Sequence, residues 1–199
     1  MMIMQTKPLY NMNEESSYRI LGFWIFLGAE IALFGTLFTT YFILSSHTAG
    51  APTQKELFEI KGVMIETFAL LTSSFTIGLV VNTIKLKSKK AFLAFFLLTM
   101  ALGLVFLGVE ISEFVTYIHE GATIHSSAAL SALFVLLGTH GAHVTFGLFW
   151  GSSILIQTMR EGITPTTANK TFIYSLYWHF LDVVWIFIFS FVYLKGMIG

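Results

Sequence analysis

Five long apolar runs constrain this chain more than any other feature of its sequence. The runs are residues 20–46, 62–84, 91–118, 127–157 and 171–197. Each has at least the length of about 20 residues that an α-helix needs to cross the hydrocarbon of a bilayer. Charged residues, prolines or polar clusters bound every run. The sequence therefore predicts an all-α fold in which residues 1–199 form a single membrane domain, a bundle of five transmembrane helices.

The composition agrees with a membrane environment. Hydrophobic residues make up 55% of the 199 residues and charged residues 11%, against roughly 45–50% and about 25% in soluble domains. The net charge is zero, so we expect no nucleic-acid partner. The chain has no cysteine, which excludes disulfides, thiolate metal sites, iron–sulfur clusters and covalent c-type haem in this chain.

The basic residues predict the orientation, because short loops rich in lysine and arginine stay in the cytoplasm. Eight of the eleven lie before the first run or in the turns after the second and fourth: Lys7, Arg19, Lys85, Lys87, Lys89, Lys90, Arg160 and Lys170. Lys55, Lys61 and Lys195 belong to the other side. We therefore expect a cytoplasmic N-terminus and a C-terminus outside. The segment before Ile20 has no apolar core followed by a cleavage site, so we expect no removable signal peptide.

Eight ionisable side chains fall inside the runs: Glu30, Glu66, Glu110, Glu113, His140, His143, His179 and Asp182. A charge at the bilayer centre costs on the order of 3 kcal/mol, so such residues usually face protein or water and have partners. Counting residues along each helix predicts two layers. Glu30, His179 and Asp182 lie in the inner layer with His143 slightly above, whereas Glu66, Glu110 and His140 lie farther out. Glu113 is nearest to the outer surface.

Three pairs at spacing i, i+3 place both members on one helix face: Glu110 with Glu113, His140 with His143, and His179 with Asp182. Three interpretations remain open. The pairs could form a carboxylate and imidazole metal site, two histidines on different helices could hold a haem, or the side chains could bond between helices. Small residues beside the histidines, including Gly141 and Gly147, favour close helix packing and therefore the third interpretation.

Most of the tryptophans and several tyrosines lie toward the ends of the runs, where amphipathic rings commonly anchor in the membrane interface. This group includes Trp24, Trp150, Trp178, Tyr174, Tyr177 and Tyr193. Trp185 lies nearer the middle of its run. We therefore expect interfacial anchoring for most of these rings and helix packing for Trp185.

Four segments, in this order, resemble subunit III of haem-copper oxidases. They are LGFWIFLGAE at 21–30, LGLVFLGVEISEF at 102–114, LLGTHGAHVTFG at 136–147 and LYWHFLDVVWIFIF at 176–189. The usual member of the family has seven helices. A chain with five helices resembles the members that belong to quinol oxidases of the bo type or the aa type. TAGAPTQKELFE at 48–59 and ETFALLTSSFTIG at 66–78 also resemble this branch.

The resemblance implies a non-redox subunit of a proton-pumping respiratory quinol:oxygen oxidoreductase, multi-pass in a bacterial plasma membrane. This chain would carry no cofactor and would not itself be catalytic. Haem and copper would belong to subunit I, its main partner, with contacts to subunit II, a small subunit IV and membrane lipids, including bound phospholipid. Its expected roles are to stabilise subunit I, hold lipid and support proton uptake.

The resemblance also identifies Glu30 as the family's buried carboxyl group that reacts with hydrophobic carbodiimide. We expect Glu30 to be neutral at pH 7, because burial disfavours a charged carboxylate; the alternative is that it only bonds to a neighbouring helix. The other seven intramembrane residues are candidates for interhelical polar contacts or a lipid cleft. The alternatives for the whole chain are subunit III of a cytochrome c oxidase, a proton-coupled transporter and a haem-carrying electron-transfer subunit.

Overall fold

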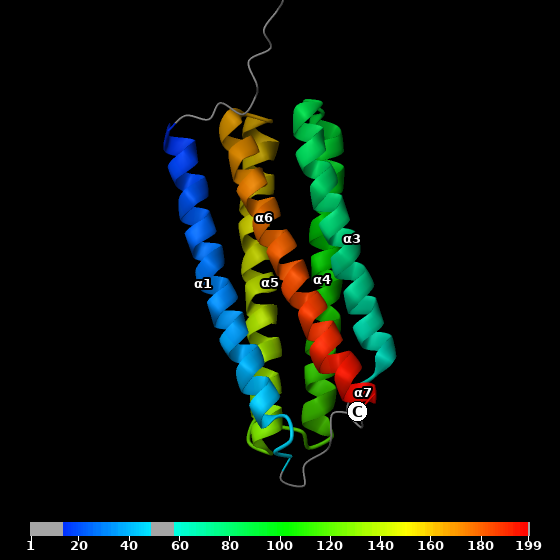
Figure 1. Ribbon diagram of the computed structural model, residues 1–199. Helices are drawn as coiled ribbons and strands as arrows, with labels where there is room; N and C mark the ends of the chain where they lie inside the picture. The colour runs from blue at the N-terminus through cyan, green and yellow to red at the C-terminus, as the bar shows by residue number, and fades with distance from the viewer. Residues whose placement is uncertain (1–13, 49–57, 199) are drawn as a thin grey trace, which may run out of the picture.

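The structure, a computed structural model, describes residues 14–48 and 58–198, which contain helices and no strand. The long helices are α1 (Glu14–Leu44), α3 (Ile60–Lys85), α4 (Lys89–His119), α5 (Ala128–Glu161) and α6 (Pro165–Ile188), which continues through η1 (Phe189–Leu194) and α7 (Lys195–Ile198) (Figure 1). Five helices are long and apolar enough to cross a membrane, so the predicted all-α bundle of five spans is confirmed. Most of the segment 48–59 lies outside the described residues.

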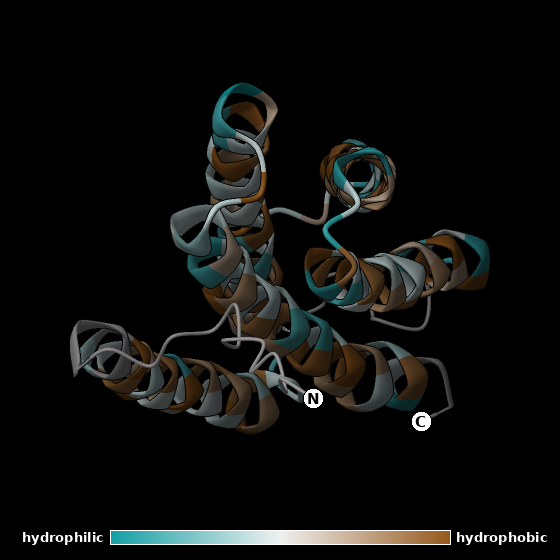
Figure 2. Cartoon of the chain, turned by 90° about the horizontal axis from the view of Figure 1, so that it is seen from above, coloured by the Kyte–Doolittle hydropathy of each residue, from teal (hydrophilic) through white to brown (hydrophobic). Residues whose placement is uncertain are grey.

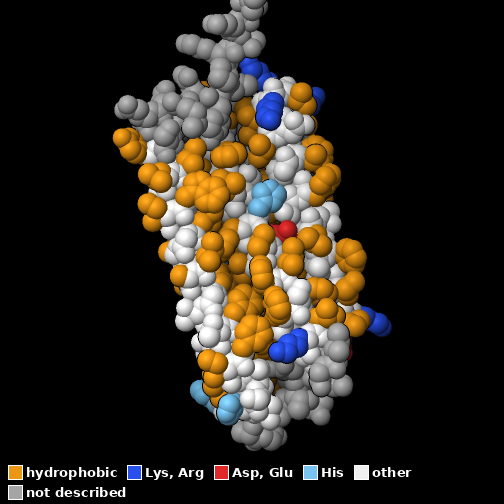
Figure 3. Space-filling model, in the orientation of Figure 1, with side chains coloured by type: hydrophobic (Ala, Val, Ile, Leu, Met, Phe, Trp, Pro, Cys, Tyr) orange, Lys and Arg blue, Asp and Glu red, His pale blue; other side chains and the backbone are white. Residues whose placement is uncertain are grey.

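The helices pack unequally. α3 lies along α4, α6 packs against α3 and α5, and α1 contacts α5 and α6 at the edge of the bundle. α1 has only a narrow buried seam, with Leu27, Phe34 and Tyr41 at every seventh residue. Apolar residues lie on several sides of the helices (Figure 2), and apolar side chains are spread over the face of the bundle that Figure 3 shows. The outer surface is therefore suited to lipid or to another membrane protein.

One end of the bundle carries most of the basic residues of the described chain, in a turn and in the helix ends beside the turns. The turn between α3 and α4 holds Lys87, and the turn between α5 and α6 lies at the same end, beside the start of α1 (Figure 1). The Lys89 ammonium donates to the Met159 carbonyl at 2.9 Å, which links the two turns. We call this the lysine end of the bundle; the opposite end holds the start of α3 and the end of α4.

α6 begins at Pro165, ahead of residue 171, because local signals start the helix there. Thr164 and Thr167 form a reciprocal capping box, and proline suits the first helical turn, where its missing N–H is not needed. Gly162 precedes this cap with φ of 78°, a conformation that glycine adopts without strain. The tight turn brings α6 back along α5.

Large aromatic side chains fill the interior instead of the interface. Trp178, Trp185, Tyr174, Tyr177 and Tyr193 are all buried, so the prediction of interfacial anchoring is wrong for Trp178 and these tyrosines, whereas Trp24 is 56% exposed. The polar atoms of Trp178, Trp185, Tyr177 and Tyr193 bond to neighbouring helices, which offsets the cost of burying them, whereas the Tyr174 hydroxyl has no hydrogen-bond partner among the described residues. The Trp178 indole donates to Ser73 at 2.9 Å and the Trp185 indole to Thr67 at 3.1 Å.

The glycines of α4 and α5 make room for these rings. A Cβ at Gly147 would lie 2.9 Å from the Trp178 ring, as would a Cβ at Gly103. A Cβ at Gly151 would lie 2.7 Å from the Tyr174 hydroxyl oxygen. The small residues therefore admit side chains from α6, and helix packing depends on glycine at these places.

Candidate functional site

Seven of the eight ionisable residues form three groups in the bundle, and His140 lies apart from them. The first joins α1 to α5: Glu30 Oε2 lies 3.0 Å from His143 Nε2, with the two side chains 13% and 20% exposed. The atoms are close enough for an ion pair but are not aligned as a hydrogen bond. The neighbouring Phe34 ring lies 5.3 Å from the His143 ring, centroid to centroid. Glu30 and His143 thus link α1 to α5.

The other ring nitrogen of His143, Nδ1, determines the tautomer of the neutral imidazole. His143 Nδ1 lies 2.7 Å from the Thr139 carbonyl oxygen. A carbonyl can only accept, so Nδ1 carries a hydrogen and, in the neutral ring, Nε2 is free to accept. Nε2 is the nitrogen that faces Glu30, so the contact between α1 and α5 joins a carboxyl oxygen to an imidazole nitrogen that can either accept or donate a proton.

The second group lies between α3 and α6. The Ser74 hydroxyl oxygen is 2.7 Å from His179 Nδ1. Asp182, 7% exposed, interacts electrostatically with the same imidazole and also bonds to Ser74. One Asp182 oxygen, Oδ1, is buried without a hydrogen-bond partner among the described residues. This group is a polar contact between two neighbouring helices.

The third group lies toward the end of the bundle opposite to the lysines. Glu113 Oε2 accepts hydrogen bonds from the hydroxyls of Tyr117 and Tyr193, each at 3.1 Å. The other oxygen, Oε1, lies against α3, since a Cβ at Gly62 would come within contact distance of it. Tyr193 belongs to η1, where the helix widens from α-helical to π-helical geometry. Glu113 thus connects α4 to α3 and to the end of α6.

Glu66 and Glu110 continue this group into the interior. Glu66 is fully buried and Glu110 is 3% exposed. Both oxygens of Glu66 and Oε1 of Glu110 lack a hydrogen-bond partner among the described residues. Glu66 interacts electrostatically with both Glu113 and Glu110. The three carboxyl groups therefore form one cluster, which we call the carboxyl cluster.

His140 is enclosed by aromatic rings. Its imidazole stacks on Trp185 with 5.5 Å between the centroids and meets the edge of Phe106 at 5.6 Å. It is fully buried, and neither ring nitrogen has a partner among the described residues. The next residue, Gly141, faces Glu110, because a Cβ there would lie 2.5 Å from Glu110 Oε2.

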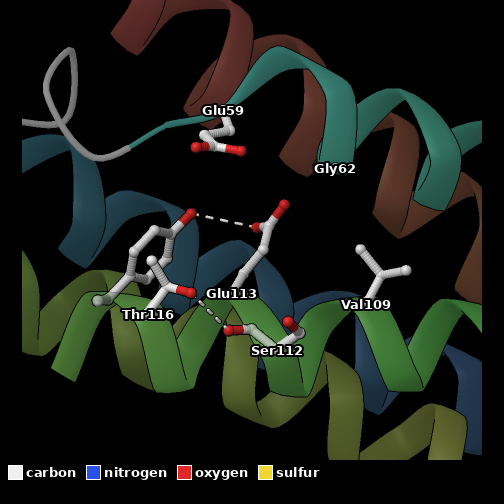
Figure 4. Close-up of a pocket in the computed structure, with 7 residues that line it drawn as sticks. Glu59, Gly62, Val109, Ser112, Glu113 and Thr116 are labelled. Carbon is white, nitrogen blue, oxygen red and sulfur yellow. Dashed lines mark hydrogen bonds between the residues drawn. The ribbon is translucent and has the colours of Figure 1, made fainter. Parts of the chain in front are cut away.

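Two hollows accompany these groups. A cavity of about 160 Å³ reaches Glu113 from the surface and is lined by Glu59, Gly62, Val109, Ser112, Glu113, Thr116 and Tyr117 (Figure 4). An open apolar groove of about 540 Å³ lies between α1 and α5, lined by Phe23, Phe26, Phe146, Phe149, Trp150 and Ser153. The first hollow has carboxyl and hydroxyl groups in its lining and is of a size for water, whereas the second suits a hydrocarbon chain.

The structure brings together Glu30 with His143, His179 with Asp182, and Glu66 with Glu110 and Glu113. Among the described residues, no group of three or more His, Asp or Glu side chains is placed to hold a metal ion. The sequence reasoning missed Ser74, Tyr117 and Tyr193. Tyr117 follows Glu113 by one helical turn and could have been found from that spacing; the other two come from distant helices and carry no local signal.

The fold and these buried polar groups define a multi-pass membrane protein whose ionisable side chains face its own helices. Residues 13–197 match the family described as cytochrome c oxidase subunit III, and the chain belongs to this family. The chain is similar to the quinol oxidase subunit 3 of Bacillus subtilis strain 168, with 56% identity over 192 residues, 96% of this chain and 94% of the relative. The probable quinol oxidase subunit 3 of Staphylococcus saprophyticus is 48% identical over 188 residues, 94% of this chain and 93% of the relative. The cytochrome c oxidase subunit 3 of Bacillus sp. strain PS3 is 45% identical over 192 residues, 96% and 93% of the two chains.

Proposed function

We propose that the chain is the non-redox subunit III of a respiratory quinol oxidase that reduces oxygen and pumps protons. The observation that carries this proposal is the 56% identity with a quinol oxidase subunit 3 over nearly the whole chain. A cytochrome c oxidase is the second candidate, favoured by the relative from Bacillus sp. strain PS3. In both, the haem and copper chemistry belongs to subunit I, and this chain is a single membrane domain without a catalytic residue.

The placement in the complex follows from the outer surface. We propose that the lysine end faces the cytoplasm of a bacterial cell and that the C-terminus lies outside, in line with the positive-inside rule. The exposed apolar faces of α1 suit contact with subunit I, and subunit II and a small subunit IV complete the complex. The apolar groove between α1 and α5 is proposed to hold a phospholipid chain.

The Glu30–His143 pair is the proposed proton-related site. A carboxyl group that shares one proton with an imidazole can be neutral while buried. A neutral carboxyl group adds to a hydrophobic carbodiimide: its proton goes to a carbodiimide nitrogen and its oxygen bonds to the central carbon. The remaining residues are proposed to serve either as polar contacts between helices or as part of a lipid cleft: Glu66, Glu110, Glu113, His140, His179 and Asp182. These roles support the assembly of subunit I and proton uptake by it.

Purification through a tag on this chain tests the proposed function. We expect mild detergent to recover haem-containing partners that oxidise quinol and consume oxygen. The matched measurement replaces quinol with reduced cytochrome c under the same conditions, and activity with cytochrome c alone would favour the second candidate. Recovery of a colourless chain without partners would contradict both.

Carbodiimide labelling tests the Glu30–His143 pair. In the complex we expect a hydrophobic carbodiimide to modify Glu30, with the adduct located by peptide mass spectrometry, and Glu30→Gln to abolish it. His143→Ala should change the labelling rate, because Glu30 then loses the group with which it shares a proton. His179→Ala, on another helix pair, is the control and should leave the rate unchanged. Equal rates in the wild type and in both histidine variants would argue against a shared proton.

A further inference from the structure

The carboxyl cluster lacks the partners that buried acids need. Glu66 has no hydrogen bond from either oxygen, although its side chain is fully buried, and Glu110 has one buried oxygen without a partner. A buried carboxylate without a partner costs several kcal/mol, so such groups are usually neutral or bonded to water. The described residues place no lysine or arginine against the cluster: the charged group facing Glu113 is Glu59, and Tyr117 and Tyr193 contribute neutral hydroxyls. No lysine or arginine among the described residues is therefore placed to neutralise the carboxyl cluster.

Glu113 occupies the boundary between this cluster and the surface. Its Oε2 is held by two tyrosine hydroxyls, whereas Oε1 is buried without a partner and lies beside Gly62 on α3. Glu66 follows Gly62 by about one turn of the same helix, and it interacts with Glu113 electrostatically. One oxygen of Glu113 is thus held by the two tyrosine hydroxyls. The other can accept a proton or a hydrogen bond from a water molecule.

The cavity connects Glu113 to the outer surface of the bundle. Glu59, Ser112 and Thr116 line it and are exposed, while Glu113 forms its inner wall (Figure 4). Figure 4 shows the side chains of Glu59 and Glu113 directed into the same space. A volume of about 160 Å³ is enough for several water molecules, each of which occupies about 30 Å³ in the liquid. Its lining offers carboxylate, hydroxyl and phenol groups as hydrogen-bond partners.

We propose that the carboxyl cluster and this cavity form a hydrated proton-exchange site that opens at the end of the bundle opposite to the lysines. A hydronium ion in the cavity transfers a proton to Glu113 Oε1 and leaves a water molecule behind. The proton passes through water to Glu66 or Glu110, which becomes a neutral carboxyl group, and the reverse transfer returns it. The orientation proposed above makes this the outer side of the membrane.

The arrangement favours protons over metal ions as the occupant. The described residues contain no group of three or more acidic or imidazole side chains placed around a metal position. One oxygen of Glu113 is already taken by two hydroxyl donors, which compete with a cation for its lone pairs. Proton exchange needs only one acceptor oxygen and a row of water molecules. Oε1 of Glu113 can be the acceptor, and the cavity has room for the water molecules.

Infrared spectroscopy of the purified oxidase complex tests this site. A protonated carboxyl group has its own carbonyl stretching band, which shifts when deuterium replaces the proton. We expect the wild type at neutral pH to show such bands, Glu66→Gln or Glu110→Gln to remove one of them, and the bands to shift promptly in heavy water. Val109→Phe, which fills the cavity, should slow this shift. Val115→Phe is the matched control, because Val115 is 48% exposed on the same helix and does not line the cavity.

Two results would overturn the proposal: no carboxyl band lost in either glutamine variant, or equal exchange with Val109→Phe and Val115→Phe. The measurement in detergent exposes both ends of the complex, so it does not depend on the orientation. Labelling of Glu113 by a membrane-impermeant carbodiimide in sealed vesicles of each orientation then assigns the side. Labelling only from the cytoplasmic face would reject the proposed orientation while the exchange site stands.

Discussion

Trp178→Ala is expected to lower the free energy of unfolding of the bundle by about 3–5 kcal/mol, the range for truncating a large buried aromatic ring. Trp178 is 1% exposed and lies where three helices meet α6. Its ring packs against Gly103 of α4 and Gly147 of α5, and its indole donates to Ser73 of α3. Truncation removes these contacts together and leaves a cavity that rigid helices cannot close.

Unfolding of the purified complex by heat or denaturant, followed through the accessibility of this subunit, measures the change. Trp24→Ala removes the same ring from the exposed surface of α1, where Trp24 is 56% exposed, and should cost far less. Trp178→Phe keeps an aromatic ring but loses the donor to Ser73, so we expect an intermediate loss. Equal destabilisation by Trp178→Ala and Trp24→Ala would contradict the central role of this ring.

The number and type of the helices could be predicted from the sequence because each span must satisfy its backbone within itself. Position along a span gives depth in the membrane, but it does not show which face of the helix meets protein. Trp24 and Trp178 both lie away from the middle of their runs, yet one is exposed and the other is buried. The difference comes from the glycines of other helices, whose positions only the packed bundle determines.

The candidate site could likewise be predicted in part from the sequence, while the rest depends on how the helices pack. Depth placed Glu30 slightly below His143, and the structure joins them across α1 and α5. Depth also placed Glu66 beside Glu110, which agrees with their electrostatic interaction. It could not show that Tyr193, on the final helix, bonds to Glu113, because that contact depends on the path of η1. The lack of partners around Glu66 likewise depends on every helix that surrounds it.

Glu113→Leu is expected to lower the free energy of unfolding by about 2–6 kcal/mol, because two buried hydroxyls lose their acceptor at about 1–3 kcal/mol each. Tyr117 and Tyr193 are 2% and 1% exposed, so water does not readily replace the lost carboxylate. Glu113→Gln keeps a carbonyl oxygen as acceptor and should restore much of the stability. The same unfolding measurement on the complex compares the two variants.

Glu66→Leu is the matched control from the same cluster, with the opposite expectation. Glu66 has no hydrogen-bond partner among the described residues, so its replacement leaves no donor stranded and removes a costly buried carboxyl group. We expect the stability to stay unchanged or to rise, while Glu113→Leu lowers it. A large loss with Glu66→Leu, equal to that of Glu113→Leu, would mean that Glu66 has a structural partner such as an ordered water. Both acids belong to one cluster, so a loss of stability confined to Glu113→Leu would point to the two tyrosine hydroxyls that only Glu113 accepts.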